Sequence, residues 1–173
     1  MVNFVTATED QEQQLYDHFI ITTSLGAPKP QILYNPQTEE YQVLGGDVLL
    51  DTRNTGQIPL RFDRVEGNFY AANSGLKSLV GSPRTVSGYY KVDHNLLQDL
   101  QGAPDHVGGK FQVSYAPDLP LLRTLVAREV WLQGRPPEAV IRIMNKYAGG
   151  GKQVMLNAAL ELKKAGYPEH AKW

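Results

Sequence analysis

The chain has 173 residues, of which 42% are hydrophobic and 20% are charged, and its formal net charge is -1. These proportions are typical of a folded protein, and the absence of cysteine excludes disulfides, thiolate metal sites and cysteine nucleophiles. No apolar run approaches the roughly 18 residues of a membrane span and no signal peptide is visible at the start, so we expect a cytoplasmic protein without a membrane partner.

Residues 1–43 predict an N-terminal cap made of a helix and a hairpin. Thr8 is a candidate helix N-cap, and three of the four residues after it are acidic, which suits the positive end of a helix dipole over residues 8–17. Further along, the apolar segments QILY and YQVL flank the turn-forming insert NPQTEE. We therefore expect a β-hairpin that leads into the next part of the chain.

Residues 44–127 contain four stretches that superimpose at an offset of 21 residues. They begin at Leu44, Val65, Val86 and Val107. A glycine recurs two residues later in every unit, and a bulky apolar residue recurs two residues after the glycine. Repeats of about 20 to 30 residues are typical of solenoids, in which each unit stacks on its neighbours.

Each repeat predicts a strand followed by a turn. Alternate side chains of a strand face opposite sides, so one set must face the core. The expected core pairs are Phe69 with Ala71, Tyr90 with Val92, and Phe111 with Val113. Leucine pairs after two of the strands would close each coil, and the segments GSP and GAP would then turn the chain.

The repeated pattern L..L.G.P..V.G.F.V occurs as LKSLVGSPRTVSGYYKV and LQDLQGAPDHVGGKFQV. It resembles the short leucine-rich repeats of bacteria and tailed phages. The resemblance implies an α/β repeat solenoid with a curved parallel sheet, a binding role and no catalytic activity. In that family a buried asparagine ladder follows the strand, and the matching positions here are Asn73, His94 and Tyr115.

From residue 119 onward the apolar residues recur with a helical period. Residues 119–134, 136–148 and 151–166 each place apolar side chains three and four positions apart, as amphipathic helices do. We predict that residues 128–173 form a three-helix C-terminal cap on the solenoid. The whole chain would then be one cooperative domain.

The strand residues that face away from the core are candidates for a binding surface. Adjacent strands lie about 4.8 Å apart, so the outward side chains of successive repeats would form one patch. Tyrosines are enriched at binding hot spots, although tyrosine pairs also stabilise neighbouring strands without a partner. The predicted protein-binding residues are Tyr70, Tyr89, Lys91, Lys110, Asp47 and Asp93, with the two aspartates setting charge complementarity.

The basic C-terminal part leaves nucleic-acid binding open as an alternative. Residues 1–120 carry 8 basic and 14 acidic side chains, whereas residues 121–173 carry 9 basic and 4 acidic ones. If the last two helices formed a helix-turn-helix, the phosphate-binding residues would be Arg142, Lys146, Lys152, Lys163 and Lys164. The apolar residues of the same helices favour a cap instead, because a cap explains them as buried core.

Other kinds of site receive little support. The segment YAGGGKQ lacks the first glycine and the Ser or Thr of a phosphate loop, so it is better interpreted as a turn whose free amides near Lys152 would hold an anion only weakly. The four histidines are too far apart in sequence for a metal site. Asp93 and His94 are adjacent in a predicted strand and should face opposite sides. We therefore predict no catalytic residue, no metal and no cofactor.

The leading hypothesis is a non-enzymatic protein–protein interaction module, and by resemblance a phage protein that binds or inhibits a host protein in the host cytoplasm. Nucleic-acid binding as an accessory factor is the second hypothesis. A small enzyme or enzyme inhibitor acting through Lys152 is the third. An uncovered strand edge would also allow the chain to form a homodimer.

Overall fold

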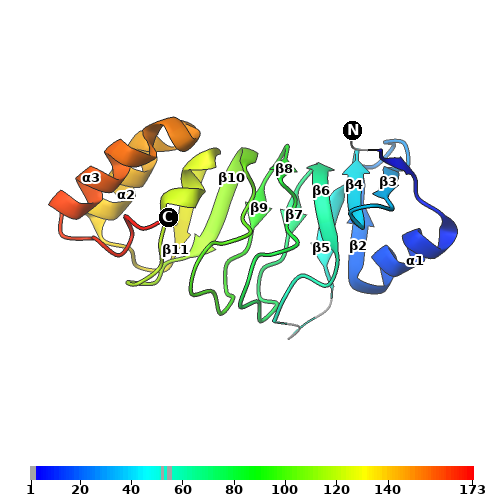
Figure 1. Cartoon of the computed structure of the whole chain (residues 1–173), viewed down its shortest axis with the longest axis horizontal. Helices are drawn as coiled ribbons and strands as arrows, with labels where there is room; N and C mark the ends of the chain where they lie inside the picture. Colours follow the sequence, from blue (N-terminus) through cyan, green and yellow to red (C-terminus); the bar gives the residue numbers. More distant parts are fainter. Residues whose placement is uncertain (1–2, 52, 54–55) are drawn as a thin grey trace.

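The computed structural model describes residues 3–51, 53 and 56–173. The chain is a β-solenoid of about four turns with parallel strands and few helices. Its coils follow one another along the long axis of the molecule, between N-terminal elements at one end and two helices at the other (Figure 1). The solenoid predicted from the 21-residue offset is therefore confirmed.

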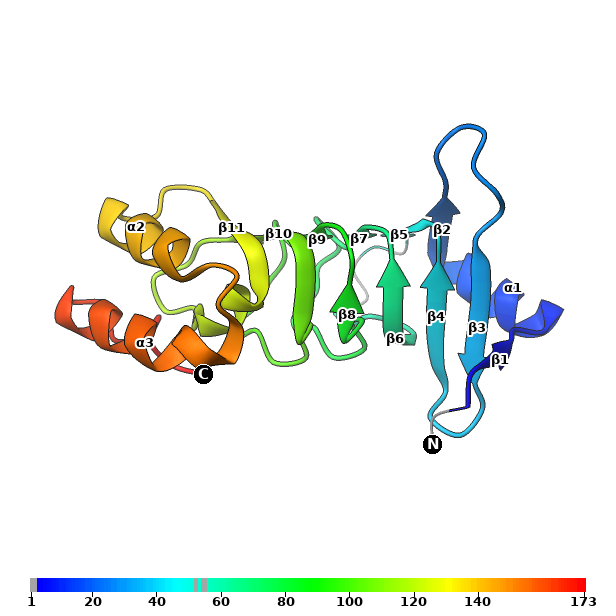
Figure 2. The same cartoon turned by 90° about the horizontal axis from the view of Figure 1, so that it is seen from above.

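Two walls of parallel strands form the coils. The hydrogen-bonded order runs β4-β6-β8-β10 along one wall and returns as β10-β9-β7-β5 along the other. The strand that takes part in both walls is β10 (His106–Ser114). The first wall, whose strands lie side by side in Figure 2, also contains β4 (Glu40–Leu44), β6 (Arg61–Glu66) and β8 (Thr85–Val86). The second wall also contains β5 (Asp47–Leu50), β7 (Phe69–Tyr70) and β9 (Tyr90–Lys91).

The strand register keeps the columns of the repeat in line. On the second wall Val48 pairs with Phe69, Phe69 with Tyr90, and Tyr90 with Phe111. All four side chains are fully buried, and the ring centroids of Tyr90 and Phe111 lie 4.9 Å apart. The alanine and the valines two positions further along are buried as well. The expected core pairs are therefore confirmed.

Tyr90 brings a polar group into this core. Its hydroxyl hydrogen-bonds with the Oγ atom of Ser82 at 2.6 Å, and both side chains are buried. Burial raises the pKa of Tyr90 far above its ordinary value. The side chain is therefore neutral at physiological pH, and its buried hydroxyl is satisfied.

Glycine is required at the corner between the two walls because successive coils approach closely there. A Cβ atom at Gly67 would lie 2.1 Å from the carbonyl oxygen of Gly46. The amide of Gly88 donates to the carbonyl of Gly67, and the amide of Gly109 donates to the carbonyl of Gly88. The glycine column of the repeat therefore marks a line of backbone contacts, as the sequence predicts.

An irregular third side closes each coil. Leu76, Leu79 and Leu100 from this side are buried. Gly81 and Gly102 then adopt left-handed φ angles of 100° and 89°, which residues with a side chain rarely adopt. The segments GSP and GAP therefore turn the chain back toward the first wall, as predicted.

A helix and a hairpin lie at the N-terminal end. Thr8 and Gln11 form a capping box at the start of α1 (Glu9–His18). The predicted hairpin is present, because β3 (Gln31–Asn35) pairs antiparallel with β4. The other two N-terminal strands also pair antiparallel, β1 (Val5–Thr6) with β3 and β2 (Phe19–Thr22) with β5.

The C-terminal end differs from the prediction. Residues 119–134 do not form an α-helix but the 3₁₀ turn η1 (Leu122–Val126) and the strand β11 (Ala127–Gln133), which runs parallel to β10. The helix prediction is wrong because the open edge of β10 offers backbone hydrogen bonds that override the local apolar period. Lys110 pairs with Glu129, an offset of only 19 residues, so a search at a fixed offset misses this strand.

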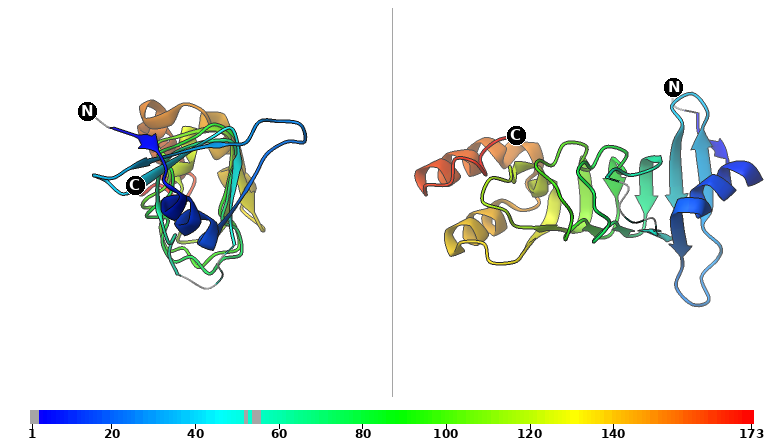
Figure 3. Two further views of the ribbon diagram at one scale, coloured as in Figure 1. Left: turned by 90° about the vertical axis from the view of Figure 1, so that its right-hand side faces the viewer. Right: turned by 90° about the horizontal axis from the view of Figure 1, so that it is seen from below.

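The other two predicted helices are present and lie beyond β11 (Figures 1 and 3). They are α2 (Glu138–Tyr147) and α3 (Met155–Lys164), and the 3₁₀ turn η2 (Gly151–Val154) leads into α3. The buried residues of α2 share one face and are Val140, Ile143 and Met144. In the described part of the chain no helix combines the length and the apolar character needed to cross a membrane.

Candidate interaction surface

The outward side chains of the second wall form two rows across the coils. In the first row lie Asp47, Asn68, Tyr89, Lys110 and Glu129, one position before the inward-facing residue of each coil. One position after it lie Leu49, Tyr70, Lys91, Gln112 and Trp131. Two aromatic side chains of these rows project into solvent, Tyr89 being 51% exposed and Trp131 50% exposed.

Lys110 lies between the two exposed aromatic rings. Its Nζ atom is 3.9 Å from the ring centroid of Trp131 and 5.6 Å from that of Tyr89. A cation over an aromatic face is attracted to the negative face of the ring. The two contacts favour an arrangement in which Tyr89, Lys110 and Trp131 lie together on the exposed wall.

Tyr70 lies in the row of Trp131, but it is less exposed than Tyr89. Burial raises the pKa of Tyr70, and the nearby Asp47 and Tyr89 add to the effect. Its hydroxyl is therefore neutral and available for hydrogen bonding at physiological pH. We name the group of Tyr70, Tyr89, Lys91, Lys110 and Trp131 the aromatic–lysine surface.

Trp131 is the member of this surface that the sequence prediction missed. It belongs to β11, which was predicted as helix, and its register partner on β10 is Gln112. The signal that could have found it is the alternation in AREVWLQ, where Val130 and Leu132 pack against the core while Glu129 and Trp131 are exposed.

Asp47 has a structural role that the sequence did not predict. Its Oδ1 atom accepts a hydrogen bond of 2.8 Å from the backbone amide of Asn68. The Oδ1 atom of Asn68 in turn accepts one of 2.7 Å from the amide of Tyr89. These side chains therefore join successive coils at the corner, and the carboxylate of Asp47 is partly occupied.

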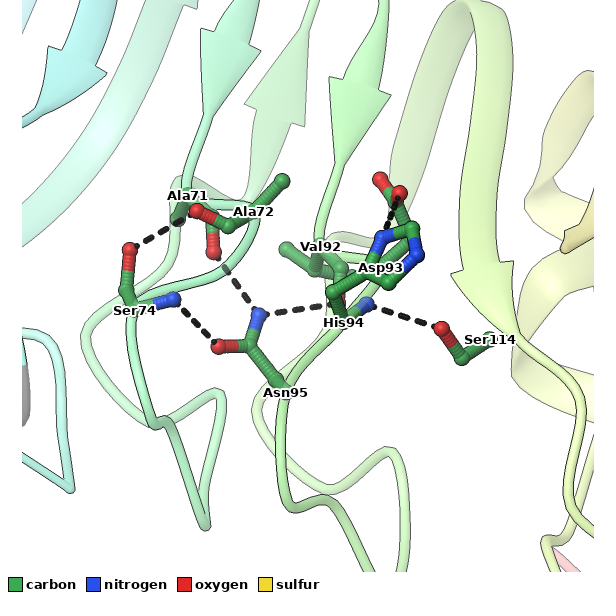
Figure 4. A network of polar contacts seen from close by, with 8 residues as sticks. All are labelled: Ala71, Ala72, Ser74, Val92, Asp93, His94, Asn95 and Ser114. Carbon is green, nitrogen blue, oxygen red and sulfur yellow. Dashed lines mark hydrogen bonds and ion pairs between the residues drawn. The ribbon is translucent and has the colours of Figure 1, made fainter.

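Asp93 was predicted to lie on the open surface, and the structure places it elsewhere. Its side chain is 3% exposed, and its Oδ2 atom lies 2.6 Å from Nδ1 of His94 (Figure 4). We also expected Asp93 and His94 to face opposite sides. That expectation is wrong because His94 has a left-handed φ of 56°, which ends the strand alternation at this point. Asp93 therefore cannot set the charge of the exposed wall.

The asparagine that links two coils, Asn95, is half-buried and lies one position away from the predicted column. The side chain of Asn95 accepts a hydrogen bond from the amide of Ser74 and donates to the carbonyls of Ala71 and Val92 (Figure 4). It also accepts one from the amide of Leu76. The predicted column contains Asn73 and His94, and both are exposed residues with left-handed φ angles. Asn95 is therefore the side chain that joins two coils behind the strands.

The five basic residues of the nucleic-acid hypothesis do not form one free group. Lys146 donates to Glu161 at 2.5 Å, an exposed contact that raises the pKa of the lysine, and Lys152 lies 3.8 Å from Asp105. No ion pair involves the others within the described residues; they are Arg142, Lys163 and Lys164. The five residues are distributed over α2, η2 and α3.

Among the residues that the structure describes, no three His, Asp or Glu side chains come together in a group that could hold a metal ion. Comparisons of the chain with protein-family models, curated proteins and solved structures give no match. The interpretation of function therefore rests on the geometry of the solenoid and its surfaces.

Proposed function

We propose that the chain is a non-enzymatic protein-interaction module that binds a protein partner through the aromatic–lysine surface. The resemblance to short leucine-rich repeats of phages extends the proposal to a phage protein that binds or inhibits a host protein in the cytoplasm. On this view the N-terminal hairpin and the C-terminal helices act as caps of the solenoid. The observation that supports the proposal best is the exposed cluster of Lys110, Tyr89 and Trp131 on an otherwise rigid wall.

Binding through these aromatic side chains costs little conformational entropy. Tyrosine and tryptophan offer large contact areas with few rotatable bonds, and they dominate the binding energy of many interfaces. Here the inward neighbour of Tyr89, Tyr90, is fully buried, and the inward neighbours of Trp131, Val130 and Leu132, are partly buried against the core, so packing holds the backbone beneath both rings. Two half-exposed aromatic side chains on either side of Lys110 leave apolar area that a partner would cover.

The charge of the surface indicates the kind of partner. Lys91 and Lys110 stand among the aromatic residues, Asp47 at the corner already accepts a backbone hydrogen bond, and the exposed Glu129 of β11 pairs in register with Lys110. A partner segment that combines aromatic or aliphatic side chains with an acidic group opposite Lys91 and a basic group opposite Glu129 would therefore complement this wall.

The test is capture of partners from the native host by the full chain, quantified by mass spectrometry. The double variant Tyr89→Ala with Trp131→Ala should reduce capture of the specific partner at least about ten-fold, since hot-spot aromatic residues each contribute about 1 kcal/mol or more. The matched control is Tyr16→Ala with Trp173→Ala, which removes one exposed tyrosine and one exposed tryptophan from other parts of the chain. Unchanged capture by the first variant, or an equal loss in the control, would contradict the proposal.

Nucleic-acid binding by the C-terminal helices is the alternative function. The observation in its favour is that Arg142, Lys163 and Lys164 lack ion-pair partners in the described part of the structure. If this alternative holds, the chain should bind DNA or heparin with an affinity that falls steeply as the salt concentration rises. Substitution of these three residues should abolish that binding.

A further inference from the structure

A cavity lies between the first wall and the connection from α2 to α3. Its volume is about 600 Å³, within the range of about 300–1,000 Å³ that is typical of small-molecule sites. The start of β10, the start of β11 and the glycines at positions 149–151 line it. Figure 2 shows that the connection passes close to β11.

The glycine segment is fixed to the solenoid. The amide of Gly149 donates to the carbonyl of Leu125 at 3.2 Å. A Cβ atom at Gly149 would lie 3.7 Å from the Cα atom of Arg128, so the two backbones are in contact. This contact brings Lys152 to the same cavity as the side chains of the first wall.

Basic side chains outnumber acidic ones around the cavity. Arg128 from β11, Lys152 from η2 and His106 from β10 line it, and the carboxylate at its rim is that of Asp105. Asp105 Oδ1 lies 3.8 Å from Lys152 Nζ, which is a long contact between two exposed groups. Within the described residues, neither Arg128 nor His106 takes part in an ion pair or a side-chain hydrogen bond.

We propose that this cavity binds a phosphorylated small molecule, with the phosphate held between Arg128 and Lys152. The guanidinium group offers a planar pair of donors that fits two phosphate oxygens, and the ammonium group adds a second positive charge. A doubly charged phosphate balances both groups, whereas Asp105 offsets only one of them. The site is independent of the aromatic–lysine surface because it lies on the first wall, and it requires no phosphate-loop motif and no reaction.

The experiment is a calorimetric titration of the full chain with inorganic pyrophosphate and with ATP at low salt. Each probe should bind at one site. Arg128→Gln and Lys152→Gln should each weaken binding about five-fold or more, since each removes a charge-assisted contact. Asp105→Asn should strengthen binding about two-fold or more, because among the described residues that line the cavity Asp105 alone carries a carboxylate.

The matched control is Lys164→Gln, which makes the same charge change on α3 outside the cavity. All four substituted side chains are exposed, so thermal unfolding should verify that each variant remains folded. The proposal is overturned if neither probe binds at millimolar concentration, or if Lys164→Gln weakens binding as much as Arg128→Gln. It is also overturned if a single-stranded oligonucleotide binds more tightly than either probe and depends on Lys163 and Lys164 instead.

Discussion

Single polar side chains join the coils of this solenoid where the backbone leaves the strands. Asn95 is the clearest case, because its one amide group serves two amides and two carbonyls from two coils. A backbone group that turns away from a strand loses its ladder partner, and leaving it unpaired costs more than a good hydrogen bond contributes. Asparagine suits this position since it both donates and accepts through a short side chain.

The first prediction follows from this arrangement. Asn95→Ala should lower the free energy of unfolding by about 2–4 kcal/mol, because four backbone groups lose their partner and water reaches them only partly. Urea unfolding followed by circular dichroism measures the change. Asn73→Gly is the control, since it removes an exposed asparagine and relaxes a left-handed φ, and it should alter stability by less than about 0.5 kcal/mol. An equal effect of both variants would refute the role of Asn95.

At the residue scale, the sequence predicts the positions that follow the 21-residue repeat and misses those that depart from it. The burial of Phe69, Tyr90 and Phe111 follows from two patterns, the alternation of side chains along a strand and the 21-residue repeat. Equivalent residues of successive repeats pair with one another in neighbouring coils. Asp93 was misplaced since alternation fails once His94 turns left-handed. A left-handed backbone conformation is hard to predict from the sequence unless the residue is glycine. The predicted asparagine column was therefore placed at His94, one position before Asn95, which makes the hydrogen bonds.

At the scale of elements, the corner between the two walls sets the spacing of the coils. In both walls the strands of successive coils pair at the ordinary spacing of a β-sheet. The backbones of successive coils must therefore come equally close at the corner, where no extra residues are inserted. Glycine permits this approach because no Cβ atom separates the backbones. β11 pairs with β10 although from Lys110 onward the sequence offset between paired residues is 19 instead of 21. The backbone hydrogen bonds between strands therefore hold the walls together even where the repeat length changes.

The second prediction concerns this corner. Gly67→Ala should destabilise the protein by about 3 kcal/mol or more, because its Cβ atom would lie 2.1 Å from the backbone oxygen of Gly46 and neither group can move alone. The control is Gly26→Ala, where nothing lies within 4 Å and only a left-handed φ of 80° opposes the side chain. That control should cost about 1–2 kcal/mol. Thermal unfolding of both variants compares them, and a Gly67 variant as stable as the Gly26 variant would contradict the close-contact explanation.

The elements at the two ends show the limit of local pattern. Residues 136–148 and 151–166 were predicted as helices correctly, because α2 and α3 bury one face and expose the other. Residues 119–134 carry a similar apolar spacing and yet contain β11. The difference is tertiary, since the open edge of β10 is a hydrogen-bonding partner that no local pattern reveals. Trp131, and with it half of the Lys110 contact, was missed for the same reason.

At the scale of the whole molecule, the last strand of a solenoid has unpaired backbone groups that can pair with another chain unless they are covered. Among the described residues β11 pairs with β10 alone, and α2 packs beside it. The buried face of α2 contains Ile143, which is 2% exposed, whereas Ile141 on the same helix is 40% exposed. We therefore expect α2 to protect the end of the solenoid, and its release to favour pairing between copies of the chain.

The third prediction tests this protection. Ile143→Asp should lower the free energy of unfolding by at least about 3 kcal/mol, because it places an unpaired charge against an apolar face, and it should produce concentration-dependent dimers as the helix detaches. Sedimentation velocity over a range of concentrations measures the association. Ile141→Asp makes the same chemical change two residues away and should leave both the stability and the association state of the parent unchanged, since Ile141 already faces solvent in part. If Ile143→Asp destabilises the chain without any association, the edge of β11 is protected by its own twist and not by α2, and the C-terminal helices are not a cap.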